Sequence, residues 1–225
     1  MPTGRVRRCI LQKHANSALA HHFEDLDQQH QAHSLGMWAF LVQEIMFFGA
    51  LFAGYTIYRM MYPDAWDVGS HHLNVQIGAA NTAVLLASSL TMALAVRCAQ
   101  LGQQKWLVTN LVLTLVLGAV FLGVKVVEYA DKYHHHLVPG TGFQTPAGEP
   151  EKLEMFFNFY FLMTGCHAFH MIIGGGVLVY LIWKAMRGSY LKDHFAPIEM
   201  MGLYWHFVDL VWIFLFPLLY LLGRH

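Results

Sequence analysis

Hydrophobic residues gather in five long runs along the chain, separated by polar segments or by segments that contain glycine and proline. The runs cover about residues 36–61, 77–99, 106–129, 155–183 and 199–222. A helix rises about 1.5 Å per residue, so roughly twenty apolar residues cross the hydrocarbon core of a bilayer. The pattern therefore predicts an all-α, polytopic membrane protein with a bundle of five transmembrane helices.

The polar segments suggest how these helices are joined. Residues 1–35 are basic without an apolar run behind them, unlike a secretory signal peptide, and we expect a cytoplasmic N-terminal arm before a transmembrane domain at 36–225. The short segment QLGQQ predicts that the second and third helices are antiparallel neighbours. Small residues at helical spacing permit close backbone approach, at Ala79, Ala83 and Ala87 and at Gly49 and Ala53, although ordinary bundle packing is the interpretation we favour.

Composition and charge agree with a membrane protein. Hydrophobic residues make up 56% of the chain and charged residues 12%, against about 25% charged in soluble domains. The formal net charge is zero, which gives no sign of a nucleic-acid partner. Cys9, Cys98 and Cys166 are isolated from one another and form neither a CxxC pair nor a disulfide framework.

The basic residues predict an orientation. With the N-terminus inside, the inner segments hold nine basic residues: Arg5, Arg7, Arg8, Lys13, Arg97, Lys105, Lys184, Arg187 and Lys192. The outer segments hold five: Arg59, Lys125, Lys132, Lys152 and Arg224. Because cytoplasmic loops carry an excess of Lys and Arg, the N-terminus is predicted to be cytoplasmic and the C-terminus periplasmic.

Several ionisable residues lie inside the apolar runs, where an Asp at the bilayer centre costs about 2.5–3.5 kcal/mol. They are predicted to face the bundle interior: Glu44, Glu128, His167, His170, His206 and Asp209. Counting along the helices puts Glu44, His170 and Asp209 in the middle of the membrane. Three uses stay open: a metal site, a proton relay, or a buried polar network between helices. The Glu-x-x-His and HExxH patterns of metal sites are absent.

Two further groups have competing interpretations. The triplet His134, His135 and His136 is either a metal-like cluster or, as we favour, a polar run at the outer membrane boundary. Tyr204, Trp205 and Trp212 form either a cofactor-binding group or, more commonly for such residues, aromatic packing.

Four stretches in order carry a family likeness: GMWAFLVQEIMFFGALFAGY, NTAVLLASSLTMALA, FLMTGCHAFHMIIGG and YWHFVDLVWIFLFPLLYL. The segment VVEY at the end of the third run adds a fifth match. The chain resembles subunit III of the haem–copper cytochrome c oxidases over about residues 35–222. One departure is that the family has seven spans, and its first two would lie before Gly36. The family's lipid cleft, between those two helices and the other five, is then either absent or completed by another chain.

The resemblance implies a function. Subunit III carries no redox centre, and the haem and copper lie in partner subunits. It packs directly on subunit I of a complex that also contains subunit II and receives electrons from a cytochrome c-type donor. It supports proton uptake and binds phospholipid, here in a bacterial plasma (inner) membrane. Glu44 matches the family glutamate that reacts with carbodiimides, and the resemblance assigns His167 and His170 to a buried polar network without a metal.

Three alternatives remain at this stage. The first is the five-helix accessory subunit of a nitric oxide reductase-type complex, which suits the length equally well. The second is a free-standing transporter, although no internal repeat is visible and only Pro217 interrupts a span. The third is a membrane metalloenzyme with its own transition metal.

Overall fold

The computed structural model describes residues 25–140, 143, 150–187 and 195–222. Within these residues it is helical and has no strand. The elements are α2 (Leu26–Met61), α3 (Pro63–His71), α4 (Val75–Gln100), α5 (Gln104–His134), α6 (Pro150–Met186), α7 (Ala196–Phe216) and the π-helical turn η1 (Pro217–Leu221). Five of these helices are long and apolar enough to cross a membrane, which confirms the predicted fold class.

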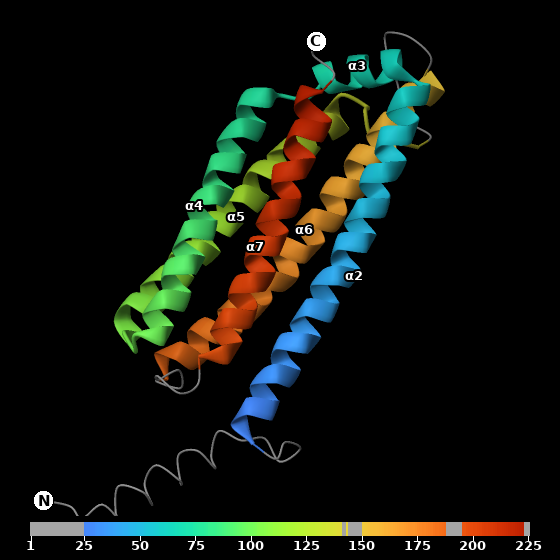
Figure 1. Ribbon diagram of the computed structural model, residues 1–225. Coiled ribbons are helices and arrows are strands. Elements are labelled where there is room, and N and C mark those ends of the chain that lie inside the picture. Colours follow the sequence, from blue (N-terminus) through green and yellow to red (C-terminus); the bar gives the residue numbers. More distant parts are fainter. Residues whose placement is uncertain (1–24, 141–142, 144–149, 188–194, 223–225) are drawn as a thin grey trace, which may run out of the picture.

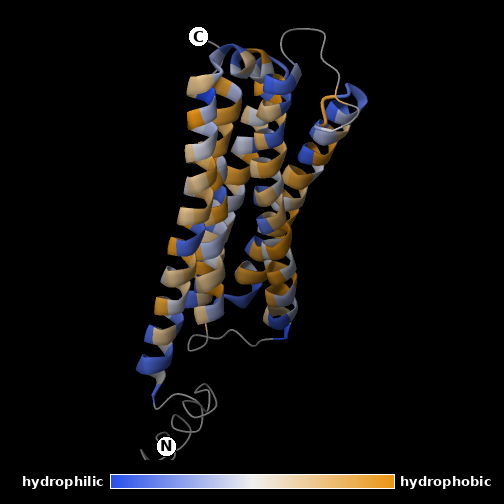
Figure 2. Cartoon of the chain, turned by 90° about the vertical axis from the view of Figure 1, so that its right-hand side faces the viewer, coloured by the Kyte–Doolittle hydropathy of each residue, from blue (hydrophilic) through white to orange (hydrophobic). Residues whose placement is uncertain are grey.

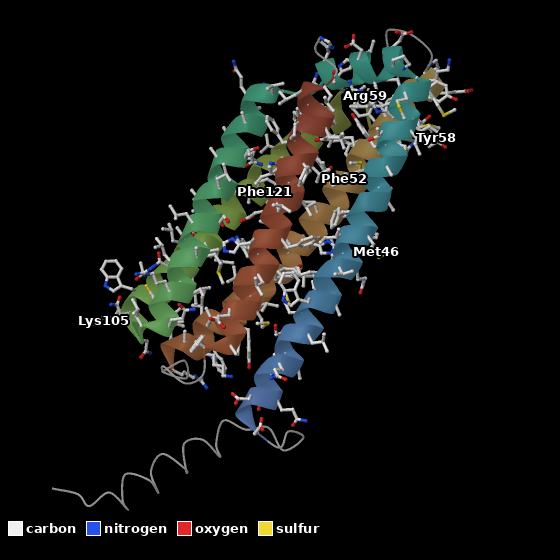
Figure 3. The ribbon with its side chains drawn as sticks, viewed as in Figure 1. Met46, Phe52, Tyr58, Arg59, Lys105 and Phe121 are labelled. Carbon is white, nitrogen blue, oxygen red and sulfur yellow. The ribbon has the colours of Figure 1, made fainter. Side chains whose placement is uncertain are left out.

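The five long helices run side by side, with the start of α2 at one end of the bundle and α3 and the end of α7 at the other (Figure 1). Lys105 and Arg59 mark these opposite ends (Figure 3). Apolar residues predominate in the middle of the helices, and hydrophilic residues gather at their ends (Figure 2). The distribution fits a bundle whose length matches the thickness of a bilayer.

Local sequence sets both ends of α4. The Asn74 side chain accepts hydrogen bonds from the first amides of the helix, those of Gln76 and Ile77, and so caps it. At the other end Gly102 adopts φ +70°, and the amide of Gln103 donates to the carbonyl of Cys98 at 2.9 Å. This glycine-centred C-cap reverses the chain within a few residues. It makes α4 and α5 the antiparallel neighbours that QLGQQ predicted.

The short helix α3 was not predicted, because nine residues of mixed polarity give no long apolar run. It lies across the end of the bundle (Figure 1) and buries Trp66. The Trp66 ring lies 5.9 Å from that of Tyr55 and 5.7 Å from that of Phe156. Through these contacts α3 holds α2 and α6 together at this end.

Trp205 is the packing centre of the bundle. A Cβ added at Gly118 would lie 3.0 Å from its indole, and one at Gly174 would lie 3.1 Å away. The indole Nε1 donates to Ser88 Oγ at 2.9 Å. Four helices, α4 to α7, therefore meet around one side chain. Trp205 and Trp212 are both buried, and their contacts are those of core packing.

The small residues that could permit close helix approach do not pack within the described part of this chain. All five small residues lie on exposed faces of their helices: Gly49, Ala53, Ala79, Ala83 and Ala87. On α4 the buried face is instead formed by residues such as Asn81, Leu85 and Ser88. Helix spacing alone did not identify this face, because α4 is apolar almost all the way round.

Candidate functional site

Glu44 of α2 and His170 of α6 form a pair between the two helices. Glu44 Oε2 lies 3.1 Å from His170 Nε2, and both side chains are largely buried. His170 Nδ1 lies 2.8 Å from the carbonyl oxygen of Cys166, one turn earlier in α6. A backbone carbonyl only accepts, so Nδ1 carries a hydrogen and donates it.

The tautomer of His170 has a chemical consequence. With Nδ1 donating, Nε2 of a neutral ring has no hydrogen and must accept one from the Glu44 carboxyl group. The only other arrangement is a carboxylate facing an imidazolium. Either way the pair holds one proton between Oε2 and Nε2.

Aromatic groups enclose this pair. The ring of Phe48 lies 5.3 Å from that of His170, and Tyr204 donates its hydroxyl hydrogen to the His170 carbonyl at 2.9 Å. On one side an apolar hollow of about 510 Å³ lies between α2 and α6. Its lining includes His170 together with Phe47, Phe161, Leu162, Gly165, Cys166 and Phe169. The pair thus borders apolar surroundings.

His167 does not join this pair, although it lies three residues from His170. Its ring is fully buried, 5.5 Å from the ring of Phe121 and 5.2 Å from that of Trp212. No described protein group makes a hydrogen bond with either ring nitrogen. The two histidines share a helix but contact different neighbours.

Glu128 belongs to a second cluster, on the other half of the bundle. Its Oε2 accepts from Lys125 Nζ at 2.6 Å, and its Oε1 accepts from the Tyr220 hydroxyl at 2.5 Å. Lys125 also donates to the hydroxyls of Tyr220 and Tyr160, at 3.0 and 3.3 Å. Its ammonium group lies 4.9 Å from the ring centre of Trp212. This is a buried ion pair with both partners hydrogen-bonded.

The remaining candidates in α7 are separate again. His206 Nδ1 lies 2.7 Å from Ser89 Oγ of α4. Asp209 is buried, and neither carboxyl oxygen has a hydrogen-bond partner among the described residues. The structure therefore divides the six predicted polar residues into local groups and does not join them in one chain of contacts.

Sequence reasoning missed the residues that complete the second cluster. Lys125 was counted among the outer basic residues, but it is buried with Glu128. The signal was present, since Lys125 and Glu128 are three residues apart inside an apolar run and share a helix face. Tyr160 and Tyr220 gave no comparable signal.

The metal interpretation receives no geometric support from the described part of the chain. There, no three His, Cys, Asp or Glu residues gather as a group that would hold a metal ion. His134, His135 and His136 are all exposed, and His135 lies beside Asp131.

Comparison with known proteins gives a consistent result. A family model described as "Cytochrome c oxidase subunit III" matches residues 16–148 and 151–224. The chain is 34% identical over 195 residues to "Cytochrome c oxidase subunit 3" of Thermostichus vulcanus, covering 84% of this chain and 87% of the relative. It is 33% identical to the protein of the same name from Corynebacterium diphtheriae, covering 83% and 86%. It is 32% identical to "Quinol oxidase subunit 3" of Bacillus subtilis, covering 84% and 86%.

Proposed function

The chain belongs to the cytochrome c oxidase subunit III family, and we propose that it serves as subunit III of a respiratory cytochrome c oxidase. It is a membrane subunit of a haem–copper oxidase complex, and subunits of the subunit III family carry no redox centre themselves. The family match and the names of the relatives favour the oxidase over a nitric oxide reductase-type complex.

The proposed partners follow from this assignment. Subunit I is the direct neighbour, subunit II completes the core, and the haems and copper lie in these partners. Some relatives are named as cytochrome c oxidase subunits and others as quinol oxidase subunits. The electron donor of the complex could therefore be a cytochrome c or a quinol. We assign a cytochrome c-type donor. The proposed location is the bacterial plasma membrane, with a cytoplasmic N-terminus and a periplasmic C-terminus. With the buried Lys125 left out of the count, nine inner and four outer basic residues support this orientation.

The Glu44–His170 pair is the observation that supports a role in proton uptake. It holds an exchangeable proton within an apolar part of the bundle, 3.1 Å between acid and base. A proton store of this kind buffers the supply to a neighbouring subunit without taking part in electron transfer. Of the other polar residues, Glu128 and His206 join neighbouring helices through Tyr220 and Ser89, whereas His167 and Asp209 are buried without a hydrogen-bond partner among the described residues.

Purification through a tag on this chain in mild detergent tests the assignment. We expect co-purification of a large haem–copper protein, a haem a spectrum, and oxygen consumption with reduced cytochrome c. Haem b with non-haem iron would instead indicate the nitric oxide reductase-type complex. Activity with quinol alone would transfer the assignment to a quinol oxidase. A transition metal bound stoichiometrically to this chain alone would overturn the non-redox role.

Carbodiimide labelling tests the role of Glu44. In the purified complex, we expect dicyclohexylcarbodiimide to modify Glu44 and not Glu128, because both oxygens of Glu128 are already engaged by Lys125 and Tyr220. Peptide mass spectrometry distinguishes the two sites. Glu44→Gln should abolish labelling in α2, keep the haem spectrum and change turnover modestly. Undiminished labelling of α2 in this variant would remove Glu44 from its assigned role.

A further inference from the structure

A groove between α4 and α5 is separate from the Glu44–His170 pair. It has a volume of about 820 Å³. Figure 1 shows α2 on the opposite side of the bundle, with α7 between it and α4. The wall of the groove within the membrane is apolar and consists of Ile77, Val120, Gly123, Val124 and Val127. Gly123 leaves the groove open, since a Cβ built on it would meet nothing within 4 Å.

The outer end of the same groove is polar. It is lined by His72, Asn74, Glu128, Asp131 and Lys132. A second hollow, of about 410 Å³, shares His72 and Asn74 with the groove and continues past the start of α4. The groove therefore changes from apolar to polar along its length, as an amphiphilic ligand does.

Lys132 is the group that indicates the charge of the ligand. Its side chain is only 7% exposed, and its Nζ donates to Asp131 Oδ2 at 2.9 Å. An ammonium group has three N–H donors, and this hydrogen bond uses one. Asp131 itself is about half exposed at the rim. A buried cation with donors to spare, facing a groove, suits an anionic oxygen ligand.

Asp131 balances the charge of Lys132, so the free N–H donors of Lys132, and not a net positive charge, favour an anionic oxygen in the groove. Glu128 is already neutralised by Lys125 and adds no free anion to the groove. Burial, and then the nearby Lys132, His135 and His71, lower the pKa of His72, so its ring is neutral at pH 7. A neutral imidazole provides one N–H donor beside Lys132, and the start of α4 adds the positive end of a helix dipole.

The length of the groove fits a lipid better than a helix. On α5 it extends from Val120 to Lys132, which is roughly 18 Å at 1.5 Å per residue. One leaflet contributes roughly half of the 30 Å hydrocarbon core, about 15 Å. A partner transmembrane helix would need a surface that continues through both leaflets.

We propose that this groove binds one phospholipid of the outer leaflet, with an acyl chain along Gly123 and the phosphate at Lys132 and His72. The site lies on α4 and α5, on the opposite side of the bundle from α2 (Figure 1). The proposal does not depend on the electron donor of the complex.

Lipid retention in the purified complex tests the site from both ends. Native mass spectrometry and lipid extraction count the phospholipids kept by the wild type and by two variants. Lys132→Gln removes the cation, and we expect about tenfold weaker retention of one phospholipid. Gly123→Leu fills the groove and should remove the same lipid. Gly176→Leu on α6, where a Cβ also meets nothing within 4 Å, is the matched control and should keep it.

The headgroup is tested on the delipidated complex with two probes. Spin-labelled phosphatidylglycerol should bind with an affinity that Lys132→Gln lowers, and a diacylglycerol with the same chains should bind weakly to both. Equal binding of the two probes would overturn the assignment of the phosphate. An unchanged lipid count in both variants would overturn the site. Loss of partner subunits in Gly123→Leu without loss of lipid would make the groove a protein interface and also overturn it.

Discussion

Two buried acid–base pairs in this bundle differ in how completely they are satisfied. Glu128 and Lys125 lie on one helix, and both oxygens of Glu128 accept a hydrogen bond. Four aromatic rings lie within 6 Å of the Lys125 ammonium: those of Tyr129, Tyr160, Trp212 and Tyr220. Glu44 and His170 belong to two helices and share a single 3.1 Å contact beside an apolar hollow.

We propose that this difference separates a structural pair from one that exchanges a proton. A buried ion pair whose remaining donors and acceptors are all occupied is held in one arrangement, and moving its proton would break several contacts. The Glu44–His170 pair has two arrangements that differ only in the position of one proton. Its helix α2 also stands apart from the rest of the bundle at its N-terminal end (Figure 1). A buried glutamate thus has different partners and surroundings in the two pairs, and we propose that its role differs accordingly.

Of the variants that test this comparison, we expect Lys125→Met to lower the free energy of unfolding the most. The variant leaves the Glu128 carboxylate buried without its cation, and breaking a buried pair in this way destabilises a protein by about 3–5 kcal/mol. Pulse proteolysis of this subunit in the purified complex, over a denaturant series, measures the free energy of unfolding. A loss below about 1 kcal/mol would contradict the structural role of the pair.

The double variant Lys125→Met/Glu128→Leu is the control for the first prediction. Replacing both partners of a buried pair by apolar groups is often neutral or stabilising. We therefore expect the double variant to regain most of the stability that the single variant loses, apart from the hydrogen bond of Tyr220. Equal instability of both variants would show that packing around Lys125, and not the unpaired charge, explains the effect.

A smaller effect is expected from His170→Leu. The substitution leaves the Glu44 carboxyl group buried without its partner, and an unsatisfied buried group costs about 1–3 kcal/mol. The same proteolysis measures it, and carbodiimide labelling of Glu44 should persist. A loss as large as that of Lys125→Met would remove the distinction between the two pairs.

The sequence was sufficient to predict five helices long and apolar enough to span a membrane, and its placing of Glu44 and His170 in one middle band agrees with their 3.1 Å contact. Length and apolar character determine a membrane span almost alone, and counting residues along two helices compares depths. It was not sufficient to predict Lys125 as buried, because Lys125 lies near the end of a span, where lysines commonly reach the interface. It also missed α3, which depends on the burial of Trp66 and not on a long apolar run. Contacts between helices, such as the approach of Tyr220 to Glu128, depend on rotations that near-uniform apolar surfaces do not reveal.

The smallest effect is expected from His167→Leu, which tests whether a buried histidine that belongs to neither pair contributes to stability. His167 lies between Phe121 and Trp212 and makes no hydrogen bond to a described group. Leucine removes two buried polar atoms, which favours the variant, and removes aromatic contacts worth about 0.5–1.5 kcal/mol. These effects oppose each other, so the free energy of unfolding should change by less than about 1 kcal/mol. A loss above about 2 kcal/mol would contradict this balance and would indicate that the ring nitrogens are hydrogen-bonded in the assembled complex.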